Sequence, residues 1–181
     1  MRIFIGIGLP DSVKNHLMAI QDKLREKGIK GSWKSDNQFH LTVVFLGEVK
    51  PEILPDIKAV LSNVTGKVPE LSLQTENIGG FPNLRKPHTI WIGLSGDIEL
   101  LTTLKNRLDK ELHKFGFKPE RRTYKPHLTI CSRPKFQNLN LSTVEVEDKL
   151  LFKVTELFLF QSQQKDGKIV YEVLHRVSLD S

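Results

Sequence analysis

Residues 39–47 read Phe-His-Leu-Thr-Val-Val-Phe-Leu-Gly, and the tetrad His40-Leu41-Thr42-Val43 within them recurs 87 residues later as His127-Leu128-Thr129-Ile130. Each tetrad lies in an apolar run that is typical of a strand. Because successive side chains of a strand point to opposite faces, each tetrad is expected to turn its histidine and threonine toward a cleft and its aliphatic residues toward a core. The same alternation places Phe45 on the core face of the first strand.

Two histidines that face one cleft suit the chemistry of phosphate esters. With an ordinary pKa of about 6.5, one ring can be neutral and the other protonated at the same pH. The neutral ring takes a proton from water while the protonated ring gives one to a leaving oxygen, and each threonine hydroxyl can hydrogen-bond a phosphate oxygen. Neither tetrad contains a carboxylate or a cysteine, so the sequence predicts catalysis without a metal or another cofactor.

The structural alternative is that these residues only stabilise their strands. A single strand histidine is more often a hydrogen-bonded structural residue, and threonine is a common strand former. The repetition of the whole tetrad about half a chain apart favours a shared function instead. We therefore place His40, Thr42, His127 and Thr129 in the predicted catalytic site.

The composition is that of a globular protein with an excess of positive charge. Of the 181 residues, 39% are hydrophobic and 27% are charged, a balance that excludes a wholly disordered chain. The formal net charge of +6 favours an anionic partner such as a nucleic acid, although solubility alone also accounts for such a charge.

The single cysteine, Cys131, excludes an intramolecular disulfide and a zinc site built from cysteines. By alternation Cys131 continues the face of His127 and Thr129, and we interpret it as a small residue at the cleft edge or in the core. The longest stretch without a charged residue, 37–47, is far shorter than the roughly 20 residues that cross a bilayer. We expect a cytoplasmic monomer that does not bind a membrane.

Strand and helix patterns alternate along the chain, which predicts about eight strands and three helices in an α+β domain. Glycine-rich residues 79–83 are expected to form a loop, and Lys165-Asp166-Gly167 the turn of a closing hairpin. The predicted strands cover residues 3–9, 41–46, 71–78, 89–94, 127–131, 154–160 and 169–177, and the apolar stripes of the helices cover 13–24, 53–61 and 101–115.

The chain resembles the 2H phosphoesterase superfamily, named for its two His-x-Thr-x motifs, and within it the RNA 2′,3′-cyclic phosphodiesterase family, also called 2′-5′ RNA ligases. The resemblance spans almost the whole chain. Besides the two tetrads, it rests on Arg2-Ile3-Phe4-Ile5-Gly6-Ile7, on Phe45-Leu46-Gly47-Glu48, on Gly80-Phe81-Pro82-Asn83, on Trp91-Ile92-Gly93, and on Lys125-Pro126 before the second tetrad.

The resemblance implies a bilobal fold in which residues 1–181 form a single domain, with two pseudo-symmetric lobes of mainly antiparallel sheet, helices outside and one motif from each lobe in a central cleft. It also implies an enzyme that opens a terminal 2′,3′-cyclic phosphate of RNA to a 2′-phosphomonoester, with weak reverse 2′-5′ ligation. In that assignment His40 is the proton donor to the 3′ oxygen and His127 the proton acceptor. The two tetrads alone do not distinguish these roles.

Relatives often carry a basic residue where this chain has Val44, and an arginine where it has Ser132. Arg133 follows one place later, and a shift of one residue in a regular strand reverses the facing side. Arg133 can therefore bind the phosphate only if the strand ends or bulges before it. Phe81, as a stacking residue, and Tyr124, in the cleft wall, complete the predicted substrate-binding residues.

Two other functions fit the same motifs. One is a non-catalytic module that binds RNA or a nucleotide, supported by the departures at Val44 and Ser132. The other is a 2H enzyme for a different cyclic phosphate or for a 2′-5′ phosphodiester. Product formation from a cyclic-phosphate oligonucleotide in the presence of chelator separates the first alternative from the enzyme, and a substrate panel separates the second.

Overall fold

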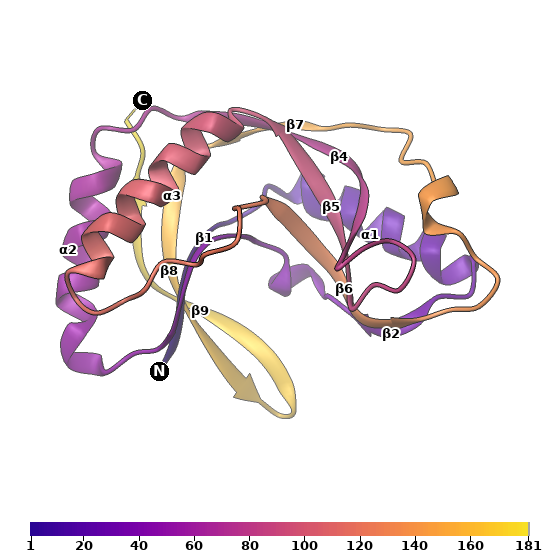
Figure 1. Cartoon of the computed structure of the whole chain (residues 1–181), viewed down its shortest axis with the longest axis horizontal. Coiled ribbons are helices and arrows are strands. Elements are labelled where there is room, and N and C mark those ends of the chain that lie inside the picture. The colour runs from indigo at the N-terminus through magenta and orange to yellow at the C-terminus, as the bar shows by residue number, and fades with distance from the viewer. Residues whose placement is uncertain (181) are drawn as a thin grey trace.

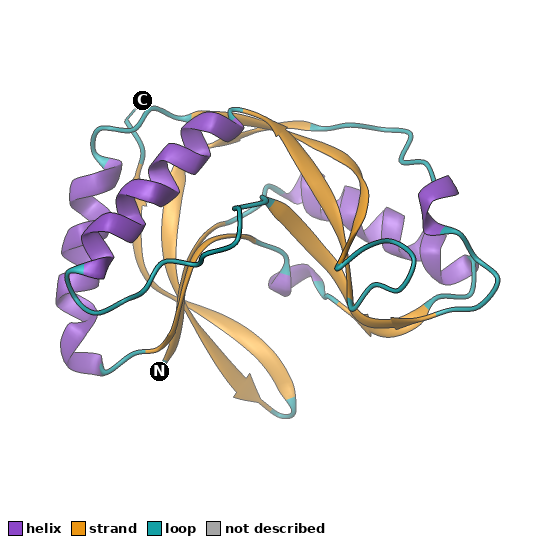
Figure 2. Cartoon of the chain, in the orientation of Figure 1, coloured by secondary structure: helices purple, strands orange, loops and turns teal. Residues whose placement is uncertain are grey.

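The computed structural model describes residues 1–180 and has the predicted α+β architecture, with two antiparallel sheets and helices packed against each (Figures 1 and 2). The first sheet has four strands, in the order β3 (Leu41–Glu48), β1 (Arg2–Ile7), β8 (Glu156–Lys165) and β9 (Lys168–Ser178). The second sheet has five strands, in the order β2 (Lys30–Trp33), β6 (His127–Lys135), β5 (Thr89–Gly96), β4 (Leu71–Phe81) and β7 (Leu151–Val154).

Three α-helices bury the predicted apolar stripes. Helix α1 (Asp11–Glu26) packs on the second sheet beside β6, whereas α2 (Leu54–Thr65) and α3 (Ile98–His113) lie side by side against the first sheet (Figure 1). Each lobe therefore combines segments from both halves of the chain. No helix among residues 1–180 has both the length and the apolar character to cross a membrane. Short 3-10 helices occupy Asp36–Gln38, Pro51–Ile53 and Leu141–Thr143.

The closing hairpin forms where the sequence predicts it. Strands β8 and β9 pair from Glu156 opposite Ser178 to Lys165 opposite Lys168. Both residues between them have positive φ, 51° at Asp166 and 74° at Gly167. A two-residue turn of this kind matches the twist of the flanking strands, so the Asp-Gly pair determines the register of the hairpin.

The two motif strands show the predicted alternation, and then each breaks it at the same place. Thr42 pairs with Gly6 while Val44 pairs with Ile5, which leaves Val43 as an extra residue in β3. In β6, Thr129 pairs with Trp91 while Cys131 pairs with Ile90, which leaves Ile130 extra. A β-bulge thus follows the threonine of each motif, and it reverses the side to which later side chains point.

The bulges overturn two predictions about side-chain direction. Phe45, expected on the core face, is 56% exposed, while Val44 before it is buried. Cys131, expected by alternation to continue the face of His127 and Thr129, is fully buried in the core, which agrees with the second of its two interpretations but not with that face. Period-two alternation holds only as far as the bulge, so both assignments failed one or two residues beyond it.

The predicted loop over residues 79–83 is wrong at its start, because Gly79, Gly80 and Phe81 belong to β4. These glycines do not form a turn. They allow other groups to pack directly against the backbone of the strand. A Cβ atom added to Gly79 would lie 2.1 Å from the Trp91 ring, and one on Gly80 would lie 2.8 Å from the Asn83 carbonyl oxygen. The Trp91 indole thus lies directly on the backbone of β4.

The remaining differences concern short or terminal segments. Two four-residue strands, β2 and β7, were not predicted, since four residues are too few to establish a period. Phe115 was expected to close the apolar stripe of the third helix. Helix α3 ends at His113, and the Phe115 side chain is 40% exposed.

The contact between Gly79 and Trp91 gives a testable consequence for stability. We expect Gly79→Ala to lower the free energy of unfolding by about 3 kcal/mol, because the methyl group overlaps the buried Trp91 indole and forces the ring or the strand to shift. Urea denaturation measures the change. Gly66→Ala is the matched control: Gly66 has a helical φ of −60° and ordinary spacing at Cβ, so its stability should fall by less than about 0.5 kcal/mol. Equal values for the two variants would contradict the packing described.

Candidate active site

Both motif histidines lie at the start of their strands. In each motif, the aliphatic residues that follow the histidine and the threonine are buried in the core. His40 directly precedes β3, and His127 is the first residue of β6. Leu41 and Val43 are buried in the first motif, and Leu128 and Ile130 in the second. These aliphatic anchors hold each strand on its own lobe, so the histidine and threonine on the opposite face have fixed positions.

Each imidazole is oriented by the main chain two residues before it. Nδ1 of His40 lies 2.8 Å from the carbonyl oxygen of Gln38, and Nδ1 of His127 lies 2.7 Å from that of Lys125. A carbonyl oxygen only accepts hydrogen bonds, so Nδ1 of each neutral ring carries the proton and donates it. In both rings Nε2 is left as the atom that can exchange a proton with a ligand.

In the first motif Nε2 already has a polar neighbour: it lies 2.9 Å from the hydroxyl oxygen of Thr42. When His40 is neutral, the hydroxyl donates to Nε2. When His40 is protonated, Nε2–H donates to the hydroxyl oxygen, which frees the hydroxyl proton for a bound anion. The His40–Thr42 pair is therefore arranged to respond to the charge of a ligand.

Aromatic rings enclose both imidazoles. The ring of His40 lies 4.7 Å from Phe4 and 4.9 Å from Tyr171, measured between centroids. The ring of His127 meets Phe81 edge to face at 4.8 Å, and Trp91 lies 5.7 Å away. These aromatic walls limit the rotation of both rings and remove water from their faces.

Burial lowers the pKa of both histidines below the ordinary value, and the hydrogen bond to the carbonyl opposes that change in each ring. The charges of Lys34 and His127 lower the pKa of His40 further, and the charge of Lys125 lowers that of His127. A nearby cation favours the neutral form of a histidine. Both rings are therefore disposed to be neutral until an anion binds.

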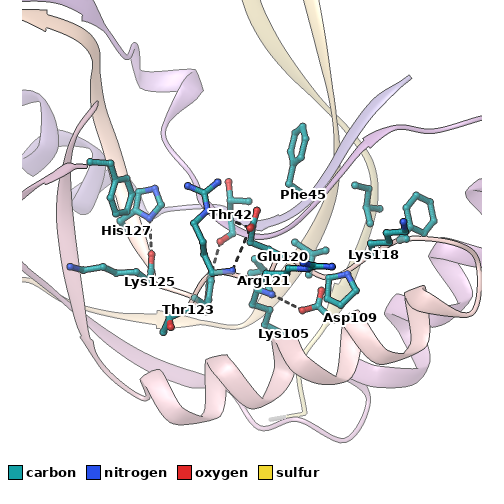
Figure 3. Close-up of a pocket in the computed structure, with 18 of the residues that line it drawn as sticks. Thr42, Phe45, Lys105, Asp109, Lys118, Glu120, Arg121, Thr123, Lys125 and His127 are labelled. Atoms are coloured by element: carbon teal, nitrogen blue, oxygen red, sulfur yellow. Dashed lines mark hydrogen bonds and ion pairs between the residues drawn. The ribbon is translucent and has the colours of Figure 1, made fainter. Parts of the chain in front are cut away.

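A cleft of about 950 Å³ opens beside the motifs and contains Thr42, Phe81, Tyr124 and His127 in its wall (Figure 3). His40 lines a second hollow of about 590 Å³, which we call the His40 groove and which shares Thr42 and Phe45 with the cleft. The cleft is rich in positive charge, with two acidic residues, Asp109 and Glu120, against five cations in its wall: Lys105, Lys118, Arg121, Arg122 and Lys125. An anion is the ligand that this wall favours.

Tyr124 connects the two lobes at this cleft. It lies in the segment before β6, and its hydroxyl donates a 2.9 Å hydrogen bond to the main-chain carbonyl of Thr42. Strand β3 is at the edge of the first sheet, where carbonyl groups on the outer side lack strand partners. Burial raises the pKa of Tyr124, which keeps the phenol protonated and able to donate. The hydrogen bond holds the first motif against the second lobe.

The predicted site residues thus fall into two groups. The structure brings His127, Thr42, Phe81 and Tyr124 into the cleft and His40 into the adjoining groove. Thr129 is half-buried beside Trp91 on the neighbouring strand and is not in the wall of either hollow.

Arg133 is likewise absent from both walls. It is exposed, has a φ of 51°, and its main-chain N–H donates to the carbonyl of His88. The bulge at Ile130 precedes both Ser132 and Arg133, so it does not bring Arg133 to the side that Ser132 takes. The predicted place of Thr129 in the catalytic site and the predicted role of Arg133 in substrate binding stay predictions.

Two residues of this region were missed at the level of sequence. Lys105 and Asp109 form a 2.5 Å ion pair on α3, with both side chains mostly buried in the cleft floor, and the Lys105 ammonium lies 5.5 Å from the Tyr124 ring centroid. Their i, i+4 spacing and the position of Lys105 on the apolar stripe, four residues after Leu101, were the available signals.

No three histidine, cysteine or acidic side chains gather into a possible metal site within the part of the chain that the structure describes. The cleft and the His40 groove together offer two imidazoles, the Thr42 hydroxyl and a set of cations.

Comparison with known proteins identifies the family. The family model described as LigT like Phosphoesterase matches residues 7–91 and again residues 92–171, so each match contains one of the two motifs. The chain belongs to this family. The resemblance to 2H phosphoesterases read from the sequence is thereby confirmed.

Individual relatives with a similar sequence support the family match, and they cover most of the chain. An RNA 2′,3′-cyclic phosphodiesterase of Methanocaldococcus jannaschii is 32% identical over 180 residues, covering 96% of this chain and 98% of the relative. One of Archaeoglobus fulgidus is 34% identical over 145 residues, covering 80% and 78%.

Among solved structures, a protein of Thermus thermophilus superposes with a TM-score of 0.83 at 25% identity, covering 99% of this chain and 98% of that one. Escherichia coli LigT complexed with 3′-AMP superposes with a TM-score of 0.81 at 23% identity and the same coverage, a likeness of fold.

The tautomers of the two histidines are directly measurable. At pH 8, we expect nitrogen-15 NMR to show both His40 and His127 protonated on Nδ1 and unprotonated on Nε2, because each Nδ1 donates to a carbonyl. On titration, both rings should take up a proton below about pH 6.5, the ordinary histidine pKa, because burial lowers the pKa of each. Assignment by His40→Gln and His127→Gln identifies the signals. An Nε2-protonated tautomer at either ring would contradict the geometry.

Proposed function

We propose that this chain is an RNA 2′,3′-cyclic phosphodiesterase that converts a terminal 2′,3′-cyclic phosphate to a 2′-phosphomonoester, with His40 and His127 as acid and base. The observation that carries the proposal is the matched pair of imidazoles, each tied by Nδ1 to a carbonyl and each left with Nε2 for proton transfer. The names of the family relatives support the substrate class, and the cationic cleft suits an RNA end.

The proposed reaction is one in-line displacement at phosphorus. Nε2 of neutral His127 removes a proton from water as the water oxygen forms a bond to phosphorus. The bond from phosphorus to O3′ breaks, and Nε2–H of protonated His40 gives its proton to O3′. The product keeps its phosphate on O2′, and the two rings exchange their protonation states through solvent before the next turnover.

The binding of the cyclic phosphate prepares this reaction. The free protein has two rings with lowered pKa values, so both are mostly neutral at neutral pH. A phosphate anion between them stabilises a positive charge on one ring and raises its pKa. In the free protein Nε2 of His40 lies on the Thr42 hydroxyl. When the Nε2–H of protonated His40 points to O3′ instead, that hydroxyl is free to donate its proton to a phosphate oxygen. We assign Thr129 the equivalent role in the second motif.

Removal of either histidine tests the catalytic assignment. We expect His40→Ala and His127→Ala each to lower kcat about 10²–10⁴-fold on an oligonucleotide with a 2′,3′-cyclic phosphate, assayed with excess chelator by chromatography of the 2′-phosphate product. His113→Ala, at the exposed end of α3, is the control and should keep full activity.

Near-normal rates in His40→Ala would contradict the mechanism, as would activity that disappears with chelator and returns with a divalent ion. Tight binding of the cyclic-phosphate end without product would instead identify a binding module.

The lowered pKa values predict an acidic optimum for the free enzyme. The reaction needs one ring protonated and the other neutral, and both pKa values lie below the ordinary histidine value. The active fraction is therefore largest below about pH 6.5 and falls as the acid loses its proton. We expect kcat/KM to decrease by up to tenfold per pH unit above that pH, and kcat to peak at a higher pH because bound phosphate raises both pKa values. A kcat/KM that is flat from pH 6 to 8 would refute this protonation scheme.

A further inference from the structure

The His40 groove has the features of a nucleoside site, and of its lining residues the proposed reaction uses only His40 and Thr42. It is walled by one face of the first sheet, where β1, β3, β8 and β9 lie side by side. Phe45 lies opposite Phe4, Arg2 opposite Ser162, and Ser162 opposite Tyr171 across the paired strands. The face therefore combines aromatic rings with a guanidinium and two hydroxyl groups.

Phe45 is the exposed aromatic ring of this face. The bulge at Val43 turns the Phe45 side chain away from the core, so that it is 56% exposed. The Arg2 guanidinium lies over the ring at 5.2 Å from its centroid. A phenyl ring open to solvent on one side is a platform for a base, and stacking of this kind is the main way that proteins hold single-stranded RNA.

The groove is continuous with the catalytic cleft. Both hollows include Thr42 and Phe45 in their walls, and His40 lies in the groove between Phe4 and Tyr171. Because of the bulge at Val43, Phe45 is only two strand steps beyond Thr42, since their partners Phe4 and Gly6 are two residues apart on β1, which is about 7 Å at the usual rise of a strand. That distance exceeds the width of one ribose, so a ring at this position meets the next nucleoside rather than the one that carries the cyclic phosphate.

The charge of the groove suits an RNA chain. Arg2 supplies a guanidinium, while the carboxylate of Glu48 lies 3.2 Å from the amino group of Met1 and is neutralised by it. A phosphate that joins two nucleosides is the anion expected beside an exposed guanidinium and an aromatic platform. In the proposed reaction His40 protonates O3′, so the ribose and the chain attached to it lie on the His40 side of the phosphorus.

From these features we infer that the His40 groove binds the penultimate nucleoside of the RNA, with its base stacked on Phe45 and the last internucleotide phosphate beside Arg2. The inference rests on the proposed function and extends it. The preferred substrate is an oligonucleotide end, and a mononucleotide cyclic phosphate is a poorer one because it leaves the groove empty.

The test compares kcat/KM for a mononucleotide 2′,3′-cyclic phosphate with that for a dinucleotide with the same terminal nucleoside and cyclic phosphate. For the unmodified protein we expect the dinucleotide to be preferred about tenfold or more, the range of one base–aromatic stack. Phe45→Ala should reduce this preference toward one, and Phe45→Tyr should restore it. Arg2→Gln should reduce it by a smaller factor that shrinks as salt is added.

Phe115→Ala is the matched control, because Phe115 is 40% exposed and lines neither hollow; it should leave the preference as it is. Equal kcat/KM for the two substrates in the unmodified protein would overturn the inference. So would a Phe45→Ala variant that keeps the dinucleotide preference, or one that loses activity equally on both substrates, which would place the terminal base on Phe45. Failure to hydrolyse either cyclic phosphate would overturn the proposed function instead.

Discussion

The arrangement of this molecule depends on one strand motif that occurs twice, at the start of β3 and of β6. In each copy the aliphatic side chains are buried in the core, and the histidine and threonine lie on the opposite face. In each motif the residue between histidine and threonine is buried in its own lobe, so the two polar side chains have no freedom to turn inward. The main chain then completes the alignment, because the carbonyl of Gln38 or Lys125 takes up the Nδ1 proton. The orientation of the two imidazoles thus follows from strand alternation and main-chain hydrogen bonding.

Strong periodic signals predicted most of the fold. The long apolar stripes of α1 and α3 and the Asp-Gly turn between β8 and β9 follow from local chemistry that a sequence displays directly. The repeated tetrad likewise predicted that a strand from each lobe would carry a histidine. Four-residue strands such as β2 and β7 left no comparable signal, because their pairing depends on partners far away in the chain.

The failures share a physical cause, since each depends on backbone irregularity or on distant packing. A bulge adds one residue without a change in composition, so Phe45 and Cys131 were placed on the wrong faces. Gly79 was placed in a loop because the residues around it are typical of one, but it lies in β4, where the absence of a side chain makes room for the Trp91 indole. The hydrogen bond from the Tyr124 hydroxyl to the Thr42 carbonyl joins residues 82 positions apart, and no local sequence pattern predicts such a contact.

The twofold character of the site has a chemical consequence. His40 and His127 have the same kind of carbonyl anchor and similar aromatic walls. They differ at Nε2, because only that of His40 lies on a threonine hydroxyl. If these two imidazoles act as acid and base, a reaction and its microscopic reverse use the same two groups with their duties exchanged, and the free-energy difference between reactants and products determines the direction.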